Sequence, residues 1–232
     1  MVTDDAAPSP SRAPDRGLLA VPADRRGRRL GQLAVGLALY GVSLALMLRA
    51  ELGLDPWDVF HQGLSERMDL GIGWIVIGVG VAVLLLWIPL RERPGLGTVA
   101  NALAVGLVVE AALWVLPDLD ALAVRVPVMV GGIVGTALAT SLYIGAGLGP
   151  GPRDGLMTGL ARRGGSVRVV RTGIEVAVLA TGWLLGGSVG VATVLFAVAI
   201  GPLVHVLLPR CTVGTPAAPG PPPEVAVLPE PG

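Results

Sequence analysis

One motif occurs twice in this chain: Leu52–Leu64 reads LGLDPWDVFHQGL, and Leu148–Leu160 reads LGPGPRDGLMTGL. The two copies align without a gap at an offset of 96 residues, and each lies between long apolar runs. The matched positions are Leu52/Leu148, Gly53/Gly149, Pro56/Pro152, Asp58/Asp154, Gly63/Gly159 and Leu64/Leu160. A duplicated apolar unit with one polar motif in each half is typical of transporter-like membrane proteins.

The similarity between the two halves resumes further along the chain, at an offset of 95 residues. The matched pairs there are Gly95/Gly190, Thr98/Thr193, Val99/Val194, Ala102/Ala197, Ala104/Ala199, Gly106/Gly201 and Val109/Val204. Two blocks in the same order at nearly the same offset indicate a true duplication. If each half contains three membrane spans, the second half must insert upside down, and a pseudo-two-fold axis in the membrane plane would relate the halves.

The composition excludes a soluble domain, because 53% of the 232 residues are hydrophobic and only 15% are charged. Gly71–Leu90 contains no charged residue and is long enough to cross a hydrocarbon core of about 30 Å. We therefore expect an all-α polytopic membrane protein with about six transmembrane helices, arranged as two inverted three-helix repeats with short motif half-helices. The expected spans are Leu30–Leu48, Ile72–Leu90, Gly97–Leu116, Val126–Ala146, Val169–Leu185 and Val189–Leu208.

These spans divide the chain into a first membrane repeat, residues 30–116, and a second, residues 126–208. Residues 1–29 and 212–232 are rich in Pro and Ala, which predicts disordered tails. Fourteen of the seventeen basic residues, all of them Arg, fall in the tails and in the second and fourth loops. By the positive-inside rule, both termini are then cytoplasmic.

Each motif has the features of a helix start. Its proline suits the first helical position, and its aspartate, two residues later, lies in the first turn near the positive helix end. In the first copy Asp55 is placed to act as the N-cap, and Gly63 and Gly159 would end helices of about two turns. Two interpretations remain open: caps within ordinary loops, or re-entrant half-helices whose N-termini point toward the midplane from opposite sides.

The candidate substrate-binding residues are those that break the symmetry of the motifs and those that carry charge at membrane depth. The first copy has Trp57 and His61 where the second has Arg153 and Met157. Ionisable groups inside spans are costly and usually face a cavity or a partner, whereas those near the interface reach water. The candidates are Trp57, Asp58, His61, Arg153, Asp154, Glu110 and His205, and Glu175 also lies within a span. Glu110 and His205 are matched positions of the repeat.

The strings AELGLDPWDVFHQGL, RPGLGTVANALAVG and GLGPGPRDGLMTGL resemble the YczE-like branch of the YczE/YyaS/YitT family of bacterial integral membrane proteins. The resemblance extends from about Gly31 to Pro209. It implies a membrane location and a multi-pass topology. The family is largely uncharacterised, so the resemblance implies no substrate.

Two functions are compatible with the sequence. The first is a small-solute transporter or channel-like protein, and the alternative is an accessory or regulatory membrane protein for a biosynthetic or export partner.

We expect no enzyme, because no metalloprotease, Ser/Lys or phosphate-loop motif is present. One Cys and two His, 144 residues apart, predict no metal site. We expect no cofactor and no nucleic-acid partner. The expected partners are the lipid bilayer and an unknown small solute, and a homo-oligomer with a second copy of the chain is left open. A polar cavity at the midplane would favour transport, and a dry, packed centre would favour the accessory role.

Overall fold

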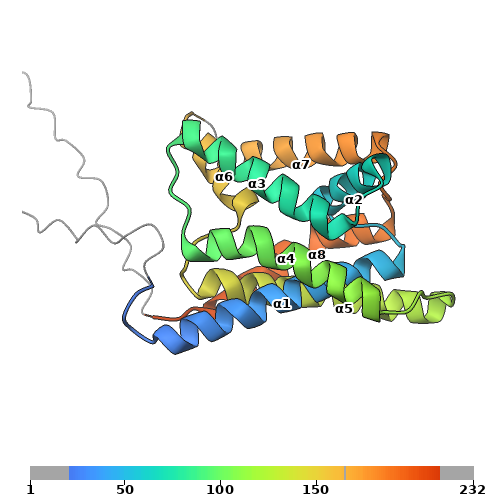
Figure 1. Cartoon of the computed structure of the whole chain (residues 1–232), viewed down its shortest axis with the longest axis horizontal. Helices are drawn as coiled ribbons and strands as arrows, with labels where there is room; N and C mark the ends of the chain where they lie inside the picture. Colours follow the sequence, from blue (N-terminus) through green and yellow to red (C-terminus); the bar gives the residue numbers. More distant parts are fainter. Residues whose placement is uncertain (1–20, 165, 215–232) are drawn as a thin grey trace, which may run out of the picture.

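The computed structural model describes residues 21–164 and 166–214, and these residues form eight α-helices and no strand (Figure 1). The helices are α1 (Arg26–Ala50), α2 (Pro56–Met68), α3 (Ile72–Leu90), α4 (Leu96–Val115), α5 (Leu122–Gly145), α6 (Pro152–Ala161), α7 (Val167–Leu184) and α8 (Val191–Cys211). Residues 1–20 and 215–232 of the two predicted tails lie outside the described residues. The helix α1 begins four residues before the predicted span, so the end of the predicted N-terminal tail is helical.

The six long helices coincide with the six predicted spans. Five of them, α1, α3, α4, α5 and α8, are long and apolar enough to cross a membrane. The helix α7 is not among these five, because it contains Arg168, Arg171 and Glu175. The fold is therefore that of an all-α, multi-pass membrane protein with five apolar spans and one more polar long helix.

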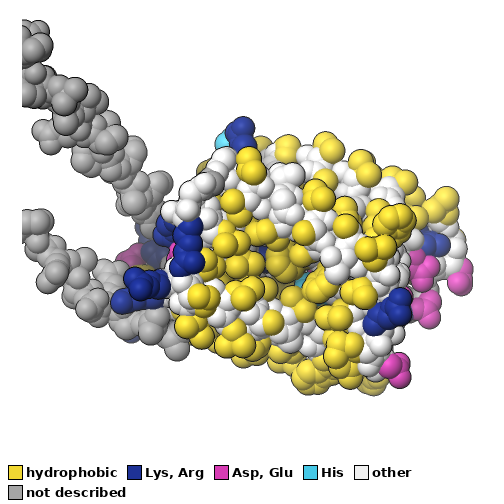
Figure 2. Space-filling view, turned by 90° about the horizontal axis from the view of Figure 1, so that it is seen from above, with side chains coloured by type: hydrophobic (Ala, Val, Ile, Leu, Met, Phe, Trp, Pro, Cys, Tyr) yellow, Lys and Arg dark blue, Asp and Glu magenta, His cyan; other side chains and the backbone are white. Residues whose placement is uncertain are grey.

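The surface also has the character of a membrane protein. Many large apolar side chains are exposed along the helices, including Ile88, Trp114, Val115, Trp183 and Leu184. On the face drawn in Figure 2, hydrophobic side chains cover the middle of the molecule and charged side chains gather toward its two ends. This distribution matches a body that is surrounded by lipid at its centre and by water at both ends.

The helices form two layers, with α1, α4, α5 and α8 in one and α2, α3, α6 and α7 in the other (Figure 1). The central contact of the first layer is between α1 and α5, with α4 packed on α1 and α8 packed on α5. In the second layer the short helix α2 lies on α7, and the short helix α6 lies on α3. Each motif helix therefore packs on the long helix of the other half.

Two of the hydrogen bonds between the two halves form an exchanged pair. The Arg29 guanidinium of α1 donates to the Ala146 carbonyl at the end of α5, with an Nη1–O distance of 2.7 Å. The Arg125 guanidinium of α5 donates to the Ala50 carbonyl at the end of α1, with an Nε–O distance of 2.6 Å. Both Arg29/Arg125 and Ala50/Ala146 are 96 residues apart. Each arginine thus satisfies a C-terminal carbonyl of the corresponding helix in the other half.

The start of each motif shows the same exchange. The backbone N–H of Gly97 donates to the Leu148 carbonyl at 2.7 Å, and the N–H of Ala192 donates to the Leu52 carbonyl at 2.9 Å. These residues are matched positions at offsets of 95 and 96. A two-fold axis between two bodies produces such exchanged pairs, since residue i of one body then contacts residue j of the other and the reverse.

The motif glycines Gly53 and Gly149 allow the two halves to approach each other closely where these hydrogen bonds form. Their φ values are +107° and +117°, a region in which L-residues are strained. A Cβ at Gly53 would lie 2.6 Å from the Gly190 nitrogen, and one at Gly149 would lie 2.6 Å from Thr98 Oγ1. The duplicated glycine is thus required by both the backbone angle and the close approach of the other half.

We predict that Gly53→Ala and Gly149→Ala each destabilise the protein by about 1–3 kcal/mol through backbone strain alone, with the steric overlap adding to this cost. Thermal unfolding in detergent measures the effect. The matched control is Gly78→Ala, in the middle of α3, where a Cβ would meet nothing within 4 Å. Equal melting temperatures for all three variants would contradict a requirement for glycine where the two halves approach each other.

Candidate functional site

Both motif helices begin where the sequence predicts. The helix α2 starts at Pro56, and Asp55 is its N-cap, with the Asp58 N–H donating to Asp55 Oδ1 at 2.9 Å. The helix α6 starts at Pro152, and Asp154 lies in its first turn. The prediction that each motif begins a short helix at its proline is confirmed.

The prediction that Gly63 and Gly159 end these helices is wrong, because α2 continues to Met68 and α6 to Ala161. Gly63 instead permits close packing, since a Cβ there would lie 2.5 Å from the Gly182 carbonyl oxygen of α7. Both glycines are buried inside their helices. Their role is contact and not termination.

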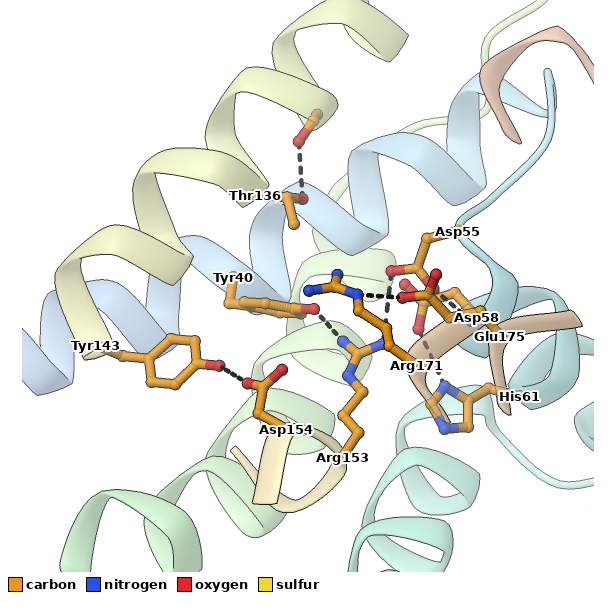
Figure 3. Close-up of polar contacts among 11 residues, drawn as sticks. Tyr40, Asp55, Asp58, His61, Thr136, Tyr143, Arg153, Asp154, Arg171 and Glu175 are labelled. Carbon is orange, nitrogen blue, oxygen red and sulfur yellow. Dashed lines mark hydrogen bonds and ion pairs between the residues drawn. The ribbon is translucent and has the colours of Figure 1, made fainter. Parts of the chain in front are cut away.

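The N-termini of α2 and α6 meet inside the protein (Figure 3). Arg153 of α6 lies between the two, with its Nη1 atom 3.5 Å from Asp55 Oδ2. Its Nη2 group donates a hydrogen bond to the Tyr40 hydroxyl of α1. The guanidinium carbon lies 5.5 Å from the centre of the Tyr40 ring and 5.9 Å from that of Trp57. Arg153 therefore joins the two motifs through an ion pair and two cation–π contacts.

Further hydrogen bonds extend this group on both sides. The Tyr143 hydroxyl of α5 donates to Asp154 Oδ2 at 2.8 Å. The His61 Nδ1 atom lies 3.0 Å from Asp58 Oδ1, one turn further along α2. We refer to these residues together as the Arg153 cluster: Tyr40, Asp55, Trp57, Asp58, His61, Tyr143, Arg153 and Asp154.

Burial controls the charge of the cluster residues on α2. It raises the pKa of Asp55 to about 6, and the neighbouring Asp58 carboxylate acts in the same direction. Burial also raises the pKa of Asp58. Burial and then the charge of Arg153 lower the pKa of His61 to about 3, so the imidazole is neutral at neutral pH. The cluster therefore contains one permanent cation and, at Asp55 and Asp58, carboxyl groups that hold protons more strongly than free aspartates do.

Two cavities adjoin the cluster. The larger cavity has a volume of about 390 Å³ and lies among α5, α6, α7 and α8. The smaller cavity has a volume of about 40 Å³ and lies among α1, α2, α3 and α4. Tyr40, Trp57 and Arg153 line both cavities and form the wall between them.

The two cavities are built from corresponding positions of the two halves. Residues of the smaller cavity and their matches in the larger one are Leu44/Thr140 and Val79/Glu175, at an offset of 96, and Asn101/Phe196 and Val105/Ile200, at an offset of 95. The motif positions correspond as well, because Pro152 lines the smaller cavity and Pro56 the larger. The protein therefore has two versions of one cavity, one of them much smaller than the other.

The Trp57 side chain carries a donor that is not used. Its exposed fraction is 6%, and within the described part of the chain the indole Nε1–H has no hydrogen-bond partner. Leaving a buried donor unsatisfied costs about 1–3 kcal/mol. Trp57 lines both cavities, but its Nε1 atom has almost no accessible surface, so the rest of the indole borders them and the donor stays covered.

The structure brings five of the predicted site residues together and leaves two apart. Trp57, Asp58, His61, Arg153 and Asp154 all belong to the cluster. His205 is exposed on α8 and lines the outer part of the larger cavity.

Glu110 is a residue of α4. It lies away from the cluster, beside the start of α3. Its Oε1 atom accepts a hydrogen bond from the Gly73 N–H at 2.9 Å. The Glu110 carboxylate therefore satisfies an N-terminal N–H group of α3, where it also meets the positive end of the helix.

Sequence reasoning missed Tyr40 and Tyr143 as site residues and treated Asp55 only as a cap. A compositional signal was present, because the chain has two Tyr residues in total and both contact charged groups of the cluster. The described residues contain no group of three or more His, Cys, Asp or Glu side chains arranged to hold a metal ion.

Comparison with known proteins places these features in a family. Residues 27–209 match a family described as "Family of unknown function (DUF6198)". An uncharacterized protein of Haemophilus influenzae is 39% identical over 76% of this chain and 81% of its own length. The uncharacterized membrane protein YczE of Bacillus subtilis is 33% identical over 74% of this chain and 80% of its own length. The uncharacterized protein YyaS of the same organism is 25% identical over 75% of this chain and 90% of its own length. No solved structure matches the chain significantly.

We predict that Asp55→Ala is more destabilising than Asp55→Asn, by about 0.5–2 kcal/mol, because Asn retains the cap on the Asp58 N–H. Both variants leave Arg153 without its carboxylate partner. Adding Arg153→Gln to Asp55→Asn should therefore recover part of the lost stability, since no unpaired buried charge then remains. Thermal unfolding in detergent measures all three variants; a double variant that is no more stable than Asp55→Asn would show that the pair is not coupled.

Proposed function

The chain belongs to the family of unknown function DUF6198, and we propose that it is a transporter-like membrane protein that binds a small polar solute at the Arg153 cluster. The observation that carries the proposal is the wall formed by Tyr40, Trp57 and Arg153, which separates two corresponding cavities. A substrate site between inverted halves, at the ends of broken helices, is a recurrent arrangement in secondary transporters.

We infer that the two halves are related by inversion. The exchanged hydrogen bonds of Arg29 and Arg125, and those of Gly97 and Ala192, support this relation. So does the correspondence of the two cavities. In such a protein the larger and smaller cavities can exchange roles, because each half can adopt the packing that the other half has now. The volumes of about 390 Å³ and about 40 Å³ then represent one of the two states.

The side chains at the cluster define the chemistry of the solute. The N–H groups of Arg153 that are not paired are donors for acceptor oxygens, and the covered Trp57 Nε1–H joins them when the indole shifts toward the cavity. Asp55 and Asp154, which also line the larger cavity, are acceptors for ammonium or hydroxyl groups. We propose a small solute that carries both kinds of group, such as a zwitterion.

The accessory or regulatory role remains the alternative. A cavity of about 390 Å³ with charged side chains on its inner wall favours the transporter, because a protein that only binds a partner needs no such cavity. We also propose that the protein lies in the inner membrane with both termini in the cytoplasm. The arginine distribution supports this orientation.

We predict that α7 crosses the membrane although it is less apolar than the other long helices. In a Cys211→Ser background, Ser188→Cys should react with an impermeant maleimide added to spheroplasts, and Ser166→Cys should react only after the membrane is opened. Both serines are exposed and flank α7 on opposite sides. Reaction of both cysteines from the same side would remove α7 as a span and place the C-terminus outside.

We predict solute entry into proteoliposomes that depends on the cluster. Vesicles shrunk in glycine, betaine or sodium acetate should swell again faster than protein-free vesicles for at least one of these solutes, as measured by light scattering. Trp57→Phe retains an aromatic ring and removes the donor, so we expect re-swelling to be slower by about tenfold, as loss of one hydrogen bond to a charged group predicts. Arg153→Gln should be at least as slow.

The matched control is Arg168→Gln, which removes an exposed arginine of α7 that does not line either cavity. All variants are compared at equal incorporation. Wild-type vesicles that swell no faster than protein-free vesicles in all three solutes would favour the accessory role.

A further inference from the structure

The two halves differ most in the packing of their last two helices. The helix α3 lies directly against α4, whereas the corresponding helices α7 and α8 do not pack on one another. The reason is visible in the sequence. Gly73 and Gly106 face each other where α3 and α4 touch, and a Cβ on either would overlap the carbonyl oxygen of the other.

The contact cannot form in the second half. Gly106 corresponds to Gly201, but Gly73 corresponds, at an offset of 95 or 96, to Arg168 or Val169. Val169 is 70% exposed, and a Cβ at Gly201 would meet nothing within 4 Å. The larger cavity is therefore open between α7 and α8, along a face that is covered with exposed apolar side chains such as Val176 and Val198.

The inside of this opening is amphipathic. One wall follows α8 through Phe196, Ile200, Val204 and Leu208. These residues extend over roughly 18 Å at about 1.5 Å per residue. The inner end contains Arg153, Asp154 and Asp55, and the α7 side carries the Arg171–Glu175 pair at 2.8 Å. An apolar wall along the bilayer direction and charges of both signs at the inner end match a molecule with an apolar chain and a head that carries both charges.

We propose that the gap between α7 and α8 is a lateral entrance from the bilayer, and that the larger cavity binds a single-chain amphiphile with a zwitterionic head. The head occupies the inner end beside Arg153 and the Trp57 ring, and the chain lies along α8 and leaves between the two helices. This inference deepens the proposed function and rests on it, because the head binds at the same cluster.

The test uses a fluorescent lysophosphatidylcholine as the amphiphile and glycerophosphocholine as its head without a chain. Binding to the purified full-length protein in nanodiscs is measured by fluorescence anisotropy. We expect saturable binding of the labelled amphiphile, which unlabelled lysophosphatidylcholine displaces at least about tenfold better than glycerophosphocholine, since the apolar chain contributes to affinity.

The decisive variant is Gly201→Leu, which fills the apolar part of the cavity. It should weaken binding of the amphiphile by about tenfold or more, as a misfit of one or more methylene groups does in an apolar pocket. The matched control is Gly173→Leu on α7, which also meets nothing within 4 Å but does not line the cavity. It should bind as the wild type does.

Several results would overturn the lateral entrance. They are equal displacement by glycerophosphocholine, binding that is unchanged in Gly201→Leu, and binding that does not saturate.

A change of oligomeric state in Gly201→Leu, seen by light scattering, would instead identify a second copy of the chain as the occupant of the gap. If Trp57→Phe and Arg153→Gln abolish glycerophosphocholine binding while Gly201→Leu does not, the polar site stands and only the entrance fails. Amphiphile binding that is lost in Gly201→Leu but unaffected by Trp57→Phe and Arg153→Gln would place the head elsewhere and contradict the proposed site as well.

Discussion

Two helix N-termini face the same small volume inside this protein, and the rest of the structure depends on how their positive partial charges are neutralised. Each N-terminus carries roughly half an elementary charge, and in an apolar interior such charges repel unless carboxylates lie beside them. Asp55, Asp58 and Asp154 supply these carboxylates from the motif itself. Because the first-turn aspartates Asp58 and Asp154 are part of the duplicated motif, residues that begin each helix also permit the two helices to meet.

This arrangement has room for one cation, and only the second half provides it. Arg153 stands at the position of Trp57, so the guanidinium of one motif lies against the indole of the other. A second arginine at position 57 would put two like charges close together, and a second tryptophan at position 153 would leave Asp55 without a partner. The difference between the motifs is therefore a physical requirement of their meeting, and it makes the two sides of the wall chemically unequal.

The sequence predicts the spans, the starts of the motif helices and the Asp55 cap, because these depend on local rules of hydropathy and capping. It does not predict which of the polar candidates belong to the site. Glu110 is a candidate as a charge within a span and Arg153 as a difference between the motifs, yet Glu110 satisfies the start of α3 and Arg153 joins the motifs. The difference is set by tertiary contacts with Gly73 and Asp55. Likewise, Gly63 has the appearance of a helix terminator, and only the position of Gly182 on α7 shows that it is a contact.

The Trp57 donor connects the packing of the cluster to its chemistry. Burying this N–H without a partner costs about as much as a hydrogen bond contributes, and a phenylalanine of similar shape would avoid the cost. Nothing in the packing of Val83, Trp87 and Leu156 around the indole requires its nitrogen. In the proposed function, this cost is recovered when the indole shifts and an acceptor binds at the wall between the cavities. On this argument the N–H group at position 57 belongs to the bound state, while the ring belongs to the fold.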